Sequence, residues 1–197
     1  MSSLGGLTYV RPPRAEHKQC LTFSVYLLCY TVGMEKTRYR VGLVVGRFQP
    51  FHKGHVYLLQ QAAQVAGKLV IALGSVGVDD QDNPLSYEQR LAMLHQVLEQ
   101  EGLADRVIKI FPSHDHESDE AWVREIVEQA GEFEVVIGNN DWTNRVLSEA
   151  GYQVMTIPDL RRDVYEGTQV RQLARQGEAW EDRVPEYLVD QVASELK

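Results

Sequence analysis

The sequence predicts an α/β protein with a doubly wound, mainly parallel five-stranded sheet and helices on both faces. From residue 41 onward, short apolar runs alternate with longer amphipathic stretches. The apolar runs are continuous, as expected of parallel strands that are buried on both faces. Regular alternation of strands and helices favours a parallel sheet covered by helices. Ligands of such folds bind beyond the carboxyl ends of the strands, so we expect the functional residues in loops that follow strands.

The first half of the expected fold contains three strands, at 41–45, 69–73 and 107–111. Between the first two strands, residues 54–66 carry apolar side chains at helical spacing, at Val56, Leu58, Leu59, Ala62, Ala63 and Ala66. Between the next two, Ser86 is expected to cap a helix over 87–101, which Gly102 ends. The apolar face of this helix is formed by Leu91, Leu94, Val97 and Leu98.

The second half continues the alternation within one domain, for which the length of 197 residues is sufficient. We expect strands at 135–137 and 152–155, and helices at 119–130, 141–150, 168–175 and 185–196. The first of these helices turns Val123, Ile126 and Val127 inward.

Composition restricts the classes of partner. The chain has 20 Lys and Arg residues against 28 Asp and Glu residues, which gives a net charge of −8. A general nucleic-acid binder needs a basic face that displaces counterions, so we expect no nucleic-acid partner. A small basic pocket for a nucleotide is compatible with an acidic protein. Both cysteines, Cys20 and Cys29, are near the N-terminus, so the remainder contains neither a disulfide framework nor a thiolate metal site.

The most informative segment follows the first expected strand and runs from Gly46 to His55. Gly46 lets the backbone leave the sheet and lets a ligand approach it closely. The next helix begins near Gly54, so its free N–H groups and positive dipole end form an anion site. His52 and His55 are three residues apart, which places them on one helix face, and Arg47 adds a permanent cation. The segment therefore predicts a site for phosphate groups.

The alternatives for these histidines are metal binding and a role as ordinary polar residues. Their position after a buried strand, a glycine and an arginine favours phosphate binding instead. A second acidic and histidine-rich segment, His114 to Glu117 with Asp119 and Glu120, also has metal-binding residue types. Ligands adjacent in sequence rarely converge on one ion, so we interpret this segment as a solvated loop and expect no protein metal site.

Gly46-Arg47-Phe48-Gln49-Pro50 with His52-Lys53-Gly54-His55 resembles the G-x-F-x-P-x-H-x-G-H signature of nucleotidyltransferases. Arg47 and Gln49 are typical of the archaeal-type nicotinamide-nucleotide adenylyltransferases, which also occur in bacteria. Further segments are similar to that family: Gly74-Ser75, Asn83 to Arg90, Trp122-Val123, Gly138-Asn139, Tyr165 to Arg171 and Gly177 to Pro185. The resemblance covers about residues 40–192 and implies a Rossmann-like nucleotidyltransferase fold.

The resemblance implies adenylyl transfer from ATP to nicotinamide mononucleotide, which gives NAD and pyrophosphate. The second pKa of the attacking phosphate is ~6, so that group is already mostly ionised and needs no general base. The protein must align two anions and neutralise charge in the transition state. The family pattern assigns this catalytic role to His52, His55, Arg47 and Arg171, although a surface salt bridge is the alternative for Arg171.

The resemblance also implies which residues bind the two substrates. The residues assigned to ATP binding are Gly46, Phe48, Gln49, Gly54, Gly138, Asn139, Thr168 and Arg171. Of these, Thr168 and Arg171 are assigned to the β- and γ-phosphates. Mg²⁺ is expected to arrive with ATP and to keep several waters. The acceptor nucleotide is assigned to Ser75, Asp115, Asp119 and Trp122, with core packing as the alternative for Trp122.

Two positions depart from the family pattern. Asp119 stands where asparagine is frequent, and a carboxylate only accepts hydrogen bonds where an amide also donates. Glu166 stands where serine is usual. Because a carboxylate would repel the phosphates of ATP, we expect Glu166 to point away from them.

Other functions stay open at this point. The same chemistry is compatible with nicotinate mononucleotide, phosphopantetheine or FMN as acceptor, or with cytidylyl transfer from CTP. A nucleotide-binding regulator without catalysis is disfavoured by the retained histidines and arginines of the phosphate site. A class I aminoacyl-tRNA synthetase also has paired histidines, but this chain is too short and acidic and lacks a Lys-Met-Ser-Lys-Ser-like segment. Relatives form closed oligomers, which implies a homo-oligomer.

Residues 1–39 differ from the rest of the chain. Arg11, Arg14 and Lys18 precede an apolar run over 21–32, which is too short to span a bilayer but has the form of a weak signal peptide. We favour Met34 as the natural start, because the remainder has the features of an ATP-dependent cytoplasmic enzyme without a membrane partner. We therefore expect residues 1–39 to be a disordered extension or to lie upstream of the natural start, and 40–197 to be the nucleotidyltransferase domain.

Overall fold

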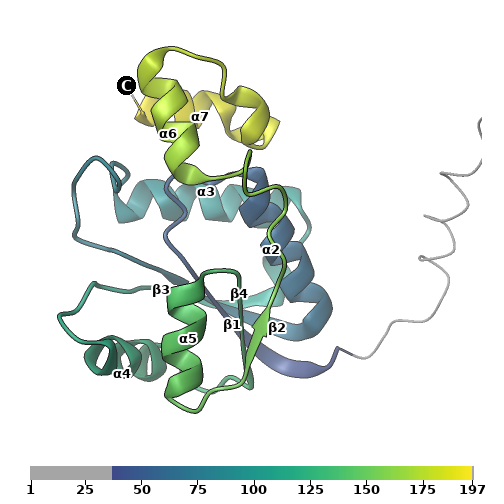
Figure 1. The fold of residues 1–197 in the computed structure, drawn as a ribbon. Helices are drawn as coiled ribbons and strands as arrows, with labels where there is room; N and C mark the ends of the chain where they lie inside the picture. The colour runs from purple at the N-terminus through teal and green to yellow at the C-terminus, as the bar shows by residue number, and fades with distance from the viewer. Residues whose placement is uncertain (1–36, 197) are drawn as a thin grey trace, which may run out of the picture. The chain divides into compact units, whose positions relative to one another are not determined.

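Five strands form one parallel sheet in the computed structural model, which describes residues 37–196 (Figure 1). They are β1 (Tyr39–Gly46), β2 (Ala66–Leu73), β3 (Val107–Pro112), β4 (Val135–Gly138) and β5 (Val154–Thr156). Their order is β3-β2-β1-β4-β5, and every neighbouring pair is parallel. The predicted doubly wound sheet is confirmed.

The direction of winding reverses between β1 and β4. The chain proceeds from β1 outward to β2 and β3, returns to β4 on the other side of β1, and continues outward to β5. Loops that follow β1 and β4 consequently leave the sheet on opposite faces. In parallel sheets this divergence opens a crevice for ligands at the carboxyl ends of the two strands.

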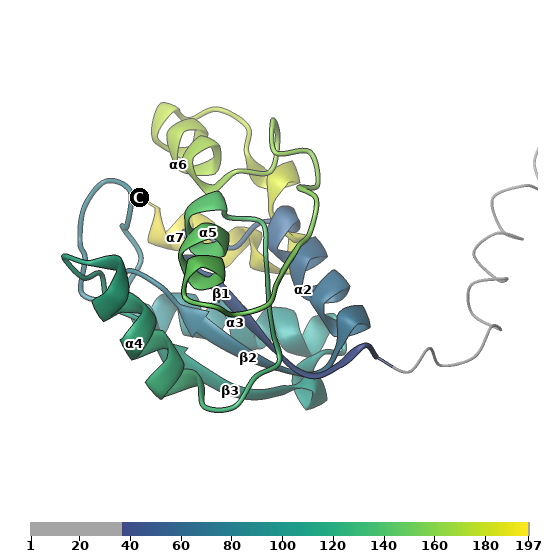
Figure 2. The ribbon, with the colours of Figure 1, turned by 60° about the horizontal axis from the view of Figure 1, so that its bottom comes forward.

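Helices cover both faces of the sheet (Figure 2). One face carries α2 (Lys53–Val65) and α3 (Tyr87–Gln100), and the other carries α4 (Asp119–Ala130) and α5 (Asp141–Glu149). The closing helices α6 (Gly167–Gln176) and α7 (Val189–Glu195) contribute Val170 and Val192 to the core of the first face.

Successive residues of the central strands enter different cores. Val44 and Ile71 pack on the side of α2 and α3, whereas Leu43 and Val70 pack on the side of α4 and α5. Because neighbouring strand residues point to opposite faces, both must be apolar when both faces are covered. This is the physical reason for the continuous apolar runs in the sequence.

Several predicted ends of elements differ from the structure. The helix predicted at 185–196 is wrong in its first part, because Glu186–Leu188 is a 3₁₀ turn and α7 begins only at Val189. Both helix types place residues three apart on one face, so apolar spacing does not separate them. Two further 3₁₀ turns, Ala104–Arg106 and Glu181–Arg183, were not predicted. The predicted cap at Ser86 is confirmed, since its side chain accepts a hydrogen bond from the Gln89 N–H.

The interpretation of residues 1–39 as an extension concerns mainly residues 1–36, which lie outside the described residues. Within the described part, Tyr39 already pairs with Ala66 across β1 and β2, so the domain begins slightly before residue 40. Among the described residues, every helix is too short or too polar to cross a bilayer.

Arg106 caps the carboxyl end of α2 from a distant position in the chain. Its guanidinium donates to the carbonyl oxygens of Ala63, Ala66 and Gly67 at 2.7–2.8 Å. The last turn of α2 has no basic residue of its own. A cation at this end also interacts favourably with the helix dipole.

We expect Arg106→Met to lower the free energy of unfolding by about 1–3 kcal/mol, because partly buried carbonyls lose their donor. Urea unfolding followed by circular dichroism measures the change. Arg124→Met, on the exposed side of α4, is the control and should stay within about 0.5 kcal/mol of the unmodified protein. Equal stability of the two variants would contradict the capping role.

Candidate active site

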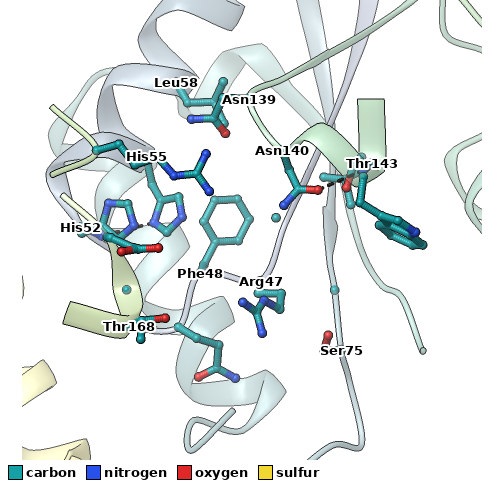
Figure 3. Close-up of a pocket in the computed structure, with 18 of the residues that line it drawn as sticks. Arg47, Phe48, His52, His55, Leu58, Ser75, Asn139, Asn140, Thr143 and Thr168 are labelled. Carbon is teal, nitrogen blue, oxygen red and sulfur yellow. Dashed lines mark hydrogen bonds between the residues drawn. The ribbon is translucent and has the colours of Figure 1, made fainter. Parts of the chain in front are cut away.

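A cavity of ≈ 330 Å³ lies at the carboxyl ends of the strands (Figure 3). All five strands contribute, since its walls come from the segments that follow each of them. Most of the predicted site residues line it: Gly46, Arg47, Phe48, Gln49, His52, His55, Ser75, Asp115, Trp122, Asn139, Thr168 and Arg171. The lining also includes residues that were not predicted, namely Val45, Leu58, Gly74, Asn140, Trp142, Thr143, Arg162, Glu166 and Gly167.

His52 and His55 form a stacked pair at the start of α2. Their ring centroids are 3.6 Å apart with an angle of 21° between the planes. The backbone N–H of His52 donates to Nδ1 of His55 at 3.3 Å. A neutral imidazole that accepts at Nδ1 carries its proton on Nε2, so the Nε2–H of His55 is available as a donor.

Burial keeps both histidines neutral. It lowers the pKa of His52 from 6.5 to about 3. Burial also lowers the pKa of His55 well below its ordinary value, and the nearby His52 and Arg47 lower it further. In the absence of an anion, the pair therefore supplies neutral hydrogen-bond donors instead of positive charge.

Phe48 supports the histidine pair from the loop after β1. Its ring stacks on Phe51 with centroids 5.0 Å apart and contacts His55 edge-on at 4.7 Å. The backbone of Phe48 is left-handed, with φ of 53°, which is rare for a residue other than glycine. A β-carbon at Gly46 would lie 2.7 Å from the Phe48 ring, so only glycine allows this packing.

Arg171 joins α6 to the loop after β1. Its side chain is 2% exposed, and NH1 donates to the carbonyl oxygen of Gln49 at 2.6 Å. NH2 donates to the Asp82 carboxylate at 2.7 Å and to the Thr168 hydroxyl at 3.2 Å. The alternative considered for Arg171, a salt bridge, is thus present, but the arginine is buried and lines the cavity.

Gln49 and Arg90 hold backbone segments at the edge of the cavity. The side-chain amide of Gln49 donates to the Leu85 carbonyl at 3.0 Å and accepts from the Leu85 N–H at 3.1 Å. Buried Arg90 donates from NH1 to the carbonyls of Arg47 and Gly74, at 2.8 and 2.6 Å. Gln49 was expected at ATP, yet both ends of its amide are engaged by the backbone. Arg90 lay in a segment similar to the family but was not predicted to support the site.

The far wall of the cavity combines polar and aromatic groups. The Ser75 hydroxyl donates to the Asp115 carboxylate at 3.0 Å. Trp122 is buried in the core of the α4 and α5 face, which confirms core packing, and it also lines the cavity. Its ring lies 4.6 Å from that of Trp142, which is 44% exposed. Trp142 follows the fourth strand closely, and the rule that sites follow strands would have included it.

Three predicted binding residues do not line the cavity. Asp119 pairs with Arg145 at 3.3 Å, so its assignment to the acceptor is not carried further. Gly54 leaves room for the His52 ring, which a β-carbon would approach to 3.0 Å. Gly138 leaves room for the Asn144 side-chain oxygen, at 2.9 Å from a β-carbon. The two glycines therefore shape the site without facing it.

One expectation about an acidic side chain is corrected, and the interpretation of the loop after β3 is tested. Glu166 lines the cavity, so the expectation that it points away is wrong. The predicted solvated loop is confirmed, because His114 to Glu117 are exposed, and the rings of His114 and His116 also hydrogen-bond to Glu125. Between residues 37 and 196, no three histidine, cysteine, aspartate or glutamate side chains are grouped as metal ligands.

Comparison with known proteins gives consistent matches. Residues 43–173 match the model of the cytidylyltransferase-like family. Nicotinamide-nucleotide adenylyltransferase from Halobacterium salinarum is 34% identical over 153 residues, which are 77% of this chain and 85% of that protein. The enzyme of the same name from Methanothrix thermoacetophila is 33% identical, over 80% of this chain and 91% of its own.

A solved structure is also similar. It is a bifunctional NMN adenylyltransferase/ADP ribose pyrophosphatase from Francisella tularensis, with a TM-score of 0.65 and 25% sequence identity. The match covers 74% of this chain but only 45% of the bifunctional protein.

We expect acid to destabilise the protein through the histidine pair. With a pKa of about 3 for folded His52 against 6.5, the unfolded chain binds more protons between these values. This contribution to stability is fully present above pH 6.5 and is lost as the pH falls toward 3, by about 1.4 kcal/mol per pH unit for His52. The lowered pKa of His55 acts in the same direction. Urea unfolding at about pH 7.5 and about pH 5, without phosphate, measures this loss.

The variant with His52→Asn and His55→Asn is the control for the carboxylates, which also titrate in acid. It should lose markedly less stability than the unmodified protein over the same interval. An identical pH dependence in both proteins would show that the two histidines are not held neutral.

Proposed function

Because the chain belongs to the cytidylyltransferase-like family and, within it, to the nicotinamide-nucleotide adenylyltransferases, we propose that it makes NAD from ATP and nicotinamide mononucleotide. A phosphate oxygen of the mononucleotide attacks the α-phosphorus of ATP and forms a new P–O bond. The bond between the α-phosphorus and the bridging oxygen breaks, and pyrophosphate leaves. The observation that carries the proposal is that one cavity has cationic and hydrogen-bonding groups for phosphate on one side and aromatic and polar residues on the other.

The phosphate side of the cavity is formed by the N-termini of α2 and α6 and by Arg47 and Arg171. At α2, His52 and His55 line the cavity, and neutral His55 carries its proton on Nε2 because Nδ1 accepts from the His52 N–H. At α6, Thr168 and Arg171 line the cavity. We assign the first pair to the α-phosphate and its developing charge, and the second to the β- and γ-phosphates. An anion beside the buried imidazoles favours their charged form, so ATP binding raises their pKa and draws in a proton.

Mg²⁺ is treated as part of the ATP substrate. The described residues offer no three-carboxylate or histidine cage, and Mg²⁺ commonly binds phosphates while keeping several waters. We assign it no dedicated protein ligand. The charge of Mg²⁺ would offset the repulsion that the phosphates of the two substrates exert on each other and on the Glu166 carboxylate at the cavity wall.

The acceptor side favours an amide over an acid. The Asp115 carboxylate lines the cavity and accepts from Ser75 with one oxygen, which leaves acceptor capacity for a carboxamide N–H. Nicotinate would place a second carboxylate against it. Trp122 and the exposed Trp142 offer aromatic surface to the pyridine ring.

By the same family resemblance, we propose a homo-oligomer that acts in the cytoplasm.

We expect His55→Ala to lower kcat by about 10²–10³-fold, because one preorganised donor to the transition state is lost. Coupled pyrophosphate release and NAD formation measure it, with ATP and Mg²⁺ in excess. His95→Ala, on the exposed side of α3, is the matched control and should retain full activity. Full activity of His55→Ala would remove the phosphate-site assignment.

We expect the unmodified enzyme to prefer nicotinamide over nicotinate mononucleotide, and Asp115→Asn to narrow that preference by about tenfold, because an amide can donate to a carboxylate. The ratio of kcat/KM for the two acceptors measures it. FMN and phosphopantetheine are offered in parallel. Turnover of FMN or phosphopantetheine alone would mean the same adenylyl transfer to a different acceptor. ATP binding without turnover of any acceptor would favour a nucleotide-binding regulator without catalysis.

A further inference from the structure

We propose that Glu125 is a positioning residue, which fixes Asp115 at the acceptor through the two histidines on either side of it in the chain. This proposal rests on the proposed function, because that function assigns Asp115 to the carboxamide of the acceptor nucleotide. It assigns a role to Glu125, His114 and His116 that neither the motifs nor the family resemblance supplied.

The Glu125 carboxylate binds both histidines at once. Oε1 accepts from Nδ1 of His114 at 2.7 Å, and Oε2 accepts from Nε2 of His116 at 2.6 Å. The backbone N–H of His114 adds a longer contact to Oε2, at 3.2 Å. A carboxylate only accepts, so each ring must carry its proton on the nitrogen that faces Glu125.

These contacts are partly removed from water, since the Glu125 side chain is 15% exposed. Burial raises the pKa of Glu125, but the hydrogen bonds from both histidines outweigh it and hold the pKa below its ordinary value. Glu125 is therefore ionised at neutral pH, and its hydrogen bonds are charge-assisted, which makes them stronger than neutral ones.

The arrangement determines the direction of Asp115. His114 and His116 reach α4, whereas Asp115 between them reaches Ser75 after β2. The three side chains thus alternate between two partners on opposite sides of the loop. While both histidines are bound to Glu125, the intervening carboxylate is directed at Ser75 and the cavity.

The fold of α4 does not require Glu125 for its own anchorage. The helix is held by its buried residues Trp122, Ile126 and Ala130 and is capped by Ser118. Glu125 follows Trp122 by three positions, so one helix face presents the indole to the cavity and the carboxylate to the loop. Removal of Glu125 should therefore release the loop while the helix stays in place.

The test is a double-mutant cycle with Glu125→Ala and Asp115→Ala. We expect Glu125→Ala to raise KM for nicotinamide mononucleotide about tenfold and to leave KM for ATP unchanged, while in the Asp115→Ala background the same change adds nothing. Glu125→Gln should restore part of the affinity, because its amide oxygen still accepts from one histidine. Glu128→Ala, exposed on the same helix, is the control and should have no effect.

A second readout does not depend on catalysis. Amide hydrogen exchange of residues 113–117 should accelerate in Glu125→Ala without ligand and stay unchanged in Glu128→Ala. Equal effects of Glu125→Ala in both backgrounds, equal rises of both KM values, or unchanged exchange would each overturn the proposal. If the unmodified enzyme makes no NAD, the proposed function fails, and the exchange measurement still decides whether Glu125 orders the loop.

Discussion

The site depends on two buried arginines that hold the segment after β1 by its backbone. Arg90 bridges the carbonyls of Arg47 and Gly74, which follow neighbouring strands, and Arg171 binds the carbonyl of Gln49 from α6. A buried guanidinium left without acceptors is costly, so these contacts are strongly favoured in the folded state. They set the spacing between the β1 loop, the β2 loop and α6, and thereby the width of the cavity.

With the backbone held in this way, two kinds of group line the cavity. The histidine pair is buried and neutral, so the cavity does not carry two adjacent charges before an anion arrives. Across the cavity, the Asp115 carboxylate accepts a hydrogen bond from the Ser75 hydroxyl. This separation matches a reaction in which phosphates must be neutralised on one side and an amide recognised on the other.

Much of the fold and part of the site could be predicted from local patterns. Continuous apolar runs located the strands because both faces of the sheet are covered, and apolar side chains at helical spacing located α2. The closing helix was only partly predicted, because apolar spacing is the same in its 3₁₀ turn. Asp119 and Glu166 were misplaced because the direction of a polar side chain depends on partners that are distant in sequence.

The sequence by itself determined the strand and helix order and the residues of the phosphate motif, since periodicity and turn chemistry act over a few residues. It also indicated the family through those residues. Tertiary structure alone decided that Gln49 serves the backbone, that Arg171 is buried against Gln49 and Asp82, and that Glu125 binds both neighbours of Asp115. These contacts join segments that meet only when the parallel strands bring their carboxyl ends to one edge, a condition that no local pattern contains.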